Sequence, residues 1–387
     1  MSEVIPLSVP AIKGNEWKYV KECLDTGWVS SVGAFVERFE RNIGAYVGAR
    51  YAIACVNGTS ALQVSLRIVG VRPEDEVIVP TLTFIAPINA AHYLGAQPIF
   101  MDCDDYYNID IAKTIEFIER ETCYTQGHTF NKKTNRRISA LIPVHVFGNA
   151  IALEALKSLC QERNIKIVED ATESLGTRYT AGALEGKHTG TIGDMGCFSF
   201  NGNKIITTGG GGMIVTDNRA YAEKAKYLTT QAKDDGIRYV HHEVGYNYRL
   251  TNLQAAVGVA QLEQLPAYVE AKRRNYQLYK RHIDLIPGLR IAGVPDCAAN
   301  NCWMYALQVE RAKYGMDREE LMRYLEERGI QTRPVWQLNH LQKPYRDCQR
   351  YRIERAPDLL EQTLNIPCSI ALDESQINRV IEALQRA

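Results

Sequence analysis

Seven short apolar runs separated by helical patterns dominate the chain between residues 51 and 217. The runs are apolar at consecutive positions, which indicates strands covered on both faces, as in parallel sheets. The stretches between them repeat apolar residues at helical spacing. This region therefore predicts an α/β fold with a large, mostly parallel sheet flanked by helices. The expected strands are 51–56, 76–80, 97–102, 140–148, 166–170, 196–201 and 211–217.

The pattern changes after about residue 248. A long helix is expected over 251–283, and the runs WMYALQV (303–309) and IQTRPVW (330–336) are typical of strands in a smaller α+β unit. Domains commonly contain about 100–200 residues, so 387 residues suit more than one. We therefore predict a large domain over 1–248 and a small C-terminal domain over 249–387.

Composition excludes several classes of protein. Lys plus Arg and Asp plus Glu both total 45, so no bulk field favours nucleic acid or anionic lipid. No apolar run approaches the roughly 20 residues of a membrane span, and the first residues lack a secretory pattern. Ten scattered cysteines without a C-x-x-C, and a His241-His242 pair without further ligands, predict neither disulfides nor a metal site. We expect a cytoplasmic protein that binds neither nucleic acid nor membrane.

The sequence Asn57-Gly58-Thr59-Ser60 is a candidate anion site. It joins an expected strand to an expected helix, and the start of a helix offers free N–H groups and a positive dipole. A simple helix cap explains the same residues equally well. The run 182–187 is one residue short of a Walker A motif, and Gly209–Gly212 is not G-x-G-x-x-G. A P-loop nucleotidase and a nicotinamide Rossmann enzyme are therefore not expected.

Asp170 and Lys204 are candidate catalytic residues. Asp170 closes the strand 166–170, where ligands of such sheets bind, although it could instead cap the next helix. Lys204 lies between a Ser-bearing strand and four glycines that would let backbone approach a ligand, although a solvated loop lysine is the simpler alternative.

Taken together, these elements predict a site for pyridoxal phosphate (PLP). Lys204 would form the Schiff base, and Asp170 would keep the pyridinium nitrogen protonated so that the ring accepts electrons. The helix start at 58–60 would hold the phosphate. Phe84 could cover one face of the ring.

The motifs, as a set in this order, resemble the DegT/DnrJ/EryC1/StrS family of sugar-nucleotide aminotransferases. The resemblance covers nearly the whole chain and implies the fold of type I PLP enzymes. A homodimer with shared active sites and L-glutamate as amino donor follow from the same resemblance. The matching segments are 26–40, 57–62, 80–90, 144–148, 169–176, 193–212, 245–258 and 333–336.

The resemblance also implies a role for individual residues. Lys204 would be the Schiff-base lysine and Asp170 the partner of the pyridine nitrogen, with Phe84 stacked on the ring. Glu173 falls where many members carry His or Gln near the ring hydroxyl. Asn247 matches an asparagine that reaches the phosphate of the other subunit. The residues expected to hold the phosphate are Gly58, Thr59 and Ser199, with Ser60 as a neighbour.

The substrate is expected to be a nucleotide-linked 4-keto-6-deoxy sugar used in polysaccharide or lipopolysaccharide synthesis. The E-S-L-G form of residues 173–176 resembles the branch acting on UDP-linked N-acetylhexosamines. T-T-G-G-G-G after Lys204 and R-P-V-W at 333–336 depart from the more frequent T-T-G-E-G-G and R-P-L-H. We also expect Trp28 and Ser30 to line the sugar-nucleotide pocket, although packing and helix capping explain them as well.

Two other functions remain open at this stage. A PLP- or pyridoxamine-dependent sugar dehydratase uses a similar scaffold, but those relatives lack the lysine that this chain retains as Lys204. A catalytically silent PLP-binding regulator would not require the complete set of Lys204, Asp170 and the phosphate-binding residues.

Overall fold

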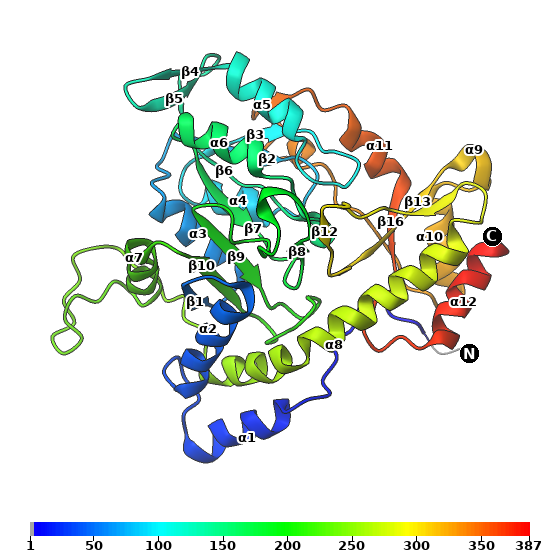
Figure 1. Ribbon diagram of the computed structural model, residues 1–387, viewed down its shortest axis with the longest axis horizontal. Helices are drawn as coiled ribbons and strands as arrows, with labels where there is room; N and C mark the ends of the chain where they lie inside the picture. The colour runs from blue at the N-terminus through cyan, green and yellow to red at the C-terminus, as the bar shows by residue number, and fades with distance from the viewer. Residues whose placement is uncertain (1–3) are drawn as a thin grey trace.

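The computed structural model describes residues 4–387 and contains a large sheet flanked by helices (Figure 1). A hairpin of β4 (Thr122–Thr125) and β5 (His128–Asn131) also joins this sheet, because β5 pairs with the first residues of the central strand β6 (Arg137–Leu141). The remaining strands lie in the order β1 (Tyr51–Cys55), β10 (Gly212–Thr216), β9 (Met195–Ser199), β7 (Lys166–Asp170), β6 (Arg137–Leu141), β2 (Glu76–Pro80), β3 (Gln97–Met101) and β15 (Arg350–Tyr351).

The prediction of a mostly parallel sheet is confirmed, with antiparallel pairing at β10 and in the hairpin of β4 and β5. Neighbouring strands run parallel from β9 to β15, but β10 runs antiparallel to both β9 and β1. β10 follows β9 directly in the chain, without a crossover helix. A strand that returns beside its predecessor in this way must be antiparallel. The run 211–217 is continuously apolar because β10 is buried, whichever way it runs.

The strand predicted over 140–148 is wrong in its second half. β6 ends at Leu141, and Val146–Gly148 forms a 3-10 turn. Phe147 has a φ of 55°, in the left-handed region that no strand residue adopts. Its N–H donates to the carboxylate of Glu173 instead of to a neighbouring strand. The apolar character of this run reflects burial of a turn.

Helices cover the sheet, and α3 to α6 occupy stretches between the expected strands, as the sequence predicts. In α3 the side chain of Asn57 accepts from the Ser60 N–H, so the helix begins where the sequence predicts. Its residues 60–66 are all buried, as expected for a helix enclosed by the sheet and other helices. These helices are α3 (Gly58–Ile68), α4 (Ala86–His92), α5 (Ile111–Arg120), α6 (Glu154–Glu162) and α7 (Arg219–Thr229).

The C-terminal part is built on α8 (Asn252–Ile283), which crosses the molecule in Figure 1. The first half of α8 packs into the core of the large sheet, whereas Tyr276, Tyr279 and Ile283 near its end form a separate cluster with a four-stranded antiparallel sheet. No helix within residues 4–387 is long and apolar enough to cross a membrane. The other elements here are β11 (Leu289–Ile291), β13 (Tyr305–Val309), β16 (Thr363–Ile366), β14 (Arg333–Pro334), α9 (Arg311–Tyr314), α10 (Arg318–Glu327), α11 (Arg355–Gln362) and α12 (Glu374–Gln385).

Three backbone pairings cross the predicted boundary at residue 248. β15 adds to β3 of the large sheet, and β12 (Ala298–Ala299) pairs with β8 (Arg178–Tyr179). Near the start of the chain, Ile5 pairs with Ile330. The helices α1 (Glu16–Thr26) and α2 (Ala34–Val47) also pack against α8. The division of the chain at 248 remains a prediction.

Candidate active site

Loops that follow the carboxyl ends of the strands enclose a cavity of about 320 Å³. Its wall contains residues from widely separated parts of the sequence, because parallel strands end at the same edge of the sheet. Six of the predicted site residues line it, namely Gly58, Thr59, Phe84, Glu173, Ser199 and Lys204.

The Lys204 side chain ends between a carboxylate and an aromatic ring. Its Nζ lies 3.5 Å from Oε1 of Glu173 and 4.2 Å from the centre of the Trp303 ring. Only 13 % of the Lys204 side chain is exposed. The backbone N–H of Lys204 donates to the carbonyl of Asn201, so a turn directly after β9 presents the lysine to the cavity. This amine is accessible to a ligand in the cavity and largely shielded from water.

Two buried carboxyl groups accompany this lysine. Asp170 ends β7, and its Oδ1 accepts the Thr172 N–H at 3.0 Å. Glu173 accepts the Phe147 N–H at 2.9 Å. Burial raises the pKa of both Asp170 and Glu173, and the nearby Lys204 charge opposes this. Buried carboxylates in excess over cations would be stabilised by a ligand that brings positive charge or a hydrogen-bond donor.

One end of the cavity is suited to a phosphate group. Gly58 and Thr59 begin α3, so their N–H groups have no acceptor within the helix. A Cβ placed on Gly58 would lie 3.0 Å from Cβ of Ser199 and 3.1 Å from Cγ2 of Thr172. Glycine thus keeps this corner open, and the hydroxyls of Thr59 and Ser199 add donors around it. These residues fit the phosphate of PLP, and the lysine and carboxyl groups fit its ring.

Comparison with known proteins agrees with this geometry. The model of the DegT/DnrJ/EryC1/StrS aminotransferase family matches residues 10–385. The chain belongs to this family. It is therefore a PLP-dependent sugar-nucleotide aminotransferase, which confirms the predicted enzyme class and cofactor.

Individual relatives match this aminotransferase over nearly its full length. GDP-perosamine synthase of Caulobacter vibrioides is 37% identical, covering 99% of this chain and 98% of that protein. EpsN of Bacillus subtilis, described as a PLP-dependent aminotransferase, is 34% identical, with 99% and 96% covered. The crystal structure of DesI with its TDP-sugar product is similar with a TM-score of 0.87 and 26% identity, covering 100% and 93% of the two chains.

Five predicted residues of the aminotransferase do not line the cavity of the single protomer. Asp170 is buried at the end of β7, and its Oδ1 accepts the N–H of Thr172, which does line the cavity. Ser60 is buried in α3, where its N–H is bonded to Asn57. Trp28 is 57 % exposed, and its carbonyl, like that of Ser30, accepts a hydrogen bond from Asn252. Asn247 is exposed and pairs with Thr230. Trp28, Ser30 and Asn247 therefore lie on the surface of the protomer, outside this cavity.

Two tryptophans that our sequence prediction did not place in the site also line the cavity. Trp336 stacks on Phe147, with ring centres 5.3 Å apart, and faces Phe84 at 6.5 Å. The sequence analysis noted that R-P-V-W replaces the more frequent R-P-L-H at 333–336, but it assigned no function to Trp336. Trp303 was assigned to a strand, whereas β13 begins only at Tyr305. Its place beside Lys204 depends on a loop that no local pattern reveals.

The glycines after Lys204 serve packing as well as the cavity. Gly210 and Gly211 line it, as the prediction of close backbone approach requires. A Cβ on Gly212, in contrast, would lie 2.5 Å from the backbone of Asn57. This glycine therefore allows β10 to pass close to the start of α3.

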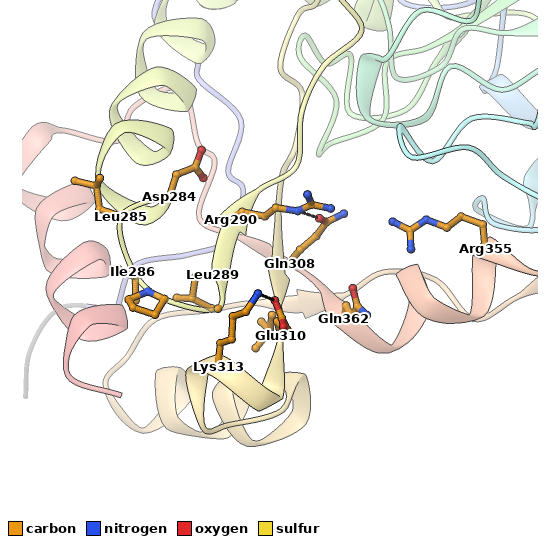
Figure 2. Close-up of a pocket in the computed structure, with 13 residues that line it drawn as sticks. Asp284, Leu285, Ile286, Leu289, Arg290, Gln308, Glu310, Lys313, Arg355 and Gln362 are labelled. Atoms are coloured by element: carbon orange, nitrogen blue, oxygen red, sulfur yellow. Dashed lines mark hydrogen bonds and ion pairs between the residues drawn. The ribbon is translucent and has the colours of Figure 1, made fainter.

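A larger cavity of about 570 Å³ lies in the C-terminal part, beside the end of α8 (Figure 2). Its charged side chains already have partners: Lys313 pairs with Glu310 at 2.8 Å, and Arg290 donates to Gln308. Arg355 pairs with Asp105. None of the predicted site residues lines this cavity, so size alone does not identify the active site.

Proposed function

We propose that this enzyme transfers an amino group from L-glutamate to a nucleotide-linked 4-keto-6-deoxy sugar, with Lys204 as the Schiff-base lysine. One observation carries the assignment of the site. Lys204, the carboxyl group of Glu173 and the start of α3 line a single cavity beside the buried Asp170. This arrangement provides an amine, acidic partners and an anion site within reach of one flat, phosphorylated ligand.

The cofactor would be held by residues from several elements. Gly58, Thr59 and Ser199 would bind its phosphate, and Phe84 would cover a ring face. Asp170 would lie at the ring nitrogen and Glu173 near the ring hydroxyl. When bound, PLP supplies an electron-accepting ring that stabilises the negative charge left when a proton leaves the amino donor.

Lys204 would move the proton during the reaction. Once displaced from the cofactor, its neutral amine can take a proton from the donor's α carbon and return it to another carbon. Asp170, as an anion, favours a protonated ring nitrogen and so strengthens the electron-accepting character of the ring. The low exposure of Lys204 limits competition from water.

The identity of the nucleotide is the finer part of this proposal. The E-S-L-G motif favours a UDP-linked N-acetylhexosamine, whereas relatives from three organisms are named GDP-perosamine synthase. These relatives are similar along the whole chain, and the motif covers four residues. We therefore propose a GDP-linked sugar as the first candidate and the UDP-linked sugar as the second.

A panel of 4-keto-6-deoxy sugars linked to GDP, UDP and dTDP, each incubated with L-glutamate, tests this assignment. NMR spectra of the products identify the aminated carbon and its stereochemistry. Amination of the GDP-linked sugar with the highest kcat/KM supports the first candidate. Elimination of a hydroxyl group without amination would contradict aminotransfer and favour the dehydratase alternative.

Trp28 is proposed to contact the sugar nucleotide of the partner subunit, because it is exposed and outside its own cavity. We expect Trp28→Ala to raise the KM for the sugar nucleotide about tenfold, the effect of losing an aromatic contact. The half-reaction with glutamate should keep its rate. Steady-state and single-turnover kinetics measure the two effects, and equal damage to both half-reactions would favour a packing role.

A homodimer with shared sites is proposed from exposed residues in two segments of the chain. Asn247 is exposed and does not line the cavity of its own protomer. The resemblance assigns it to the phosphate site of the other subunit. Large apolar side chains are also exposed on two segments, one preceding Asn247 and one around Trp28, and exposed apolar groups of this kind are typical of an interface. They are Val29, Val32, Ile237, Tyr239 and Val244.

Mixing two inactive variants tests this proposal. After subunit exchange between Lys204→Ala and Asn247→Ala proteins, hybrid dimers have one site with both lesions and one with neither. Random exchange should therefore restore about a quarter of the wild-type activity. Mass spectrometry of intact dimers verifies the exchange. Complete exchange without recovery of activity would exclude shared sites.

A further inference from the structure

The indole of Trp303 is fixed by contacts that do not involve Lys204. Its Nε1 donates to the carbonyl of Asn203 at 2.7 Å, and its backbone N–H donates to Oδ1 of Asn301 at 3.0 Å. Only 2 % of Trp303 is exposed. The ring is therefore held as a rigid face at the cavity wall.

A buried lysine also donates a hydrogen bond to the backbone of Trp303. Lys272, on α8, donates from Nζ to the carbonyl of Trp303 at 2.7 Å and also to that of Cys368. Burial lowers the pKa of Lys272. The two carbonyl oxygens accept the hydrogen bonds that water would accept from an exposed amine. Through Lys272 the ring position is tied to α8 and to the segment after β16.

The Lys204 amine lies against this face of the indole. Its Nζ is 4.2 Å from the ring centre, within the range of a cation–π contact, and Glu173 lies on another side at 3.5 Å. A lysine side chain has many rotamers, and an amine that must move a proton between two carbon atoms benefits from being held in one of them.

We propose that Trp303 is a positioning residue that holds the Lys204 amine whenever the amine is not bonded to the cofactor. The inference rests on the proposed Schiff-base role of Lys204. In the step concerned, the donor's C–H bond would break and an N–H bond would form on Lys204, with the electron pair taken up by the ring that a bound cofactor would supply. The N–H bond then breaks as the proton is delivered to a second carbon, and Lys204 becomes neutral again. The ammonium formed between these events lies on the indole face.

Labelling of the cofactor-free protein tests the contact directly. Trace acetic anhydride acetylates free amines, and peptide mapping compares Lys204 with Lys280, a partly exposed lysine paired with Asp284, in the same sample. Trp303→Leu removes the ring that stabilises the ammonium, so Lys204 should be acetylated about threefold to tenfold faster. Trp303→Phe keeps a smaller ring and should give a smaller increase. Trp17→Leu, at a tryptophan 78 % exposed, is the matched control and should leave Lys204 unchanged.

Single-turnover reactions with L-glutamate and its α-deuterated form test the consequence for catalysis. In Trp303→Leu the proton-transfer step should slow about tenfold, and the deuterium isotope effect on the half-reaction should rise. A tryptophan that only stabilised the fold would reduce the amount of active protein without changing the isotope effect. Circular dichroism and melting temperature establish that the variants compared are folded.

The outcomes separate this inference from the proposed function. Acetylation rates in the order wild type, Trp303→Phe, Trp303→Leu, together with a larger isotope effect, support it. Identical Lys204 acetylation in all folded Trp303 variants overturns it, even where borohydride attaches the pyridoxyl group to Lys204. A pyridoxyl group found on another lysine overturns the proposed function itself.

Discussion

The Lys204→Ala enzyme should transaminate at least about a thousandfold more slowly than the wild type. The substitution removes both the amine that bonds to the cofactor and the group that moves the proton, and positioned proton transfer alone contributes about 10²–10⁴ in rate. Non-covalent binding of PLP should persist, because Gly58, Thr59 and Ser199 remain in place. Stopped-flow absorbance with glutamate measures the loss.

Borohydride reduction and peptide mapping decide whether the loss has this cause. In the wild type the pyridoxyl group should be found on the peptide containing Lys204, and in Lys204→Ala it should be absent. Lys280→Ala, on the surface of α8, is the control and should retain activity. A protein that binds PLP at Lys204 but never reacts with any amino donor would instead be the silent regulator considered above.

Asp170→Asn should retain the cofactor and its covalent attachment but lose most of its catalytic rate, by about 10²-fold or more. The amide has nearly the same shape as the carboxylate and keeps an oxygen that can accept the Thr172 N–H. It cannot stabilise a protonated ring nitrogen, so the ring accepts electrons poorly. Asp170 is 3 % exposed, which leaves water little opportunity to replace the charge.

The difference between the two variants is the measurable signature. Borohydride should label Lys204 in Asp170→Asn as fully as in the wild type, while the glutamate half-reaction slows. Asp358→Asn, at a side chain 60 % exposed on α11, controls for loss of a carboxylate elsewhere. A wild-type rate in folded Asp170→Asn would show that another group is the partner of the ring nitrogen.

Much of this site was predictable because its residues lie at the ends of strands. The strands expected over 166–170 and 196–201 place Asp170 and Ser199 at one edge of the sheet, once the strands are known to be parallel neighbours. Lys204 follows within the next turn, and Glu173 is three residues beyond Asp170. Short distances along the chain from a well-predicted strand made these residues identifiable.

The parts that escaped prediction depend on distant contacts or unusual backbone. Trp303 bonds to Asn203 across 100 residues of sequence, so its position is a property of the folded chain. Phe147 was predicted within a strand, because hydrophobicity reports burial and not the sign of φ. The expected nucleotide was taken from the four residues of the E-S-L-G motif, whereas the relatives named GDP-perosamine synthase are similar along the whole chain.

The three pairings that join β3 to β15, β8 to β12 and Ile5 to Ile330 also bear on how such enzymes can be recombined. A chimera spliced at residue 248 would combine strand partners that were selected in different parents. It would also separate Lys272 and Trp303 from the Lys204 of the same parent. Exchange of substrate preference between members should therefore succeed by grafting individual loops onto an intact chain, and swapping whole halves should yield insoluble protein.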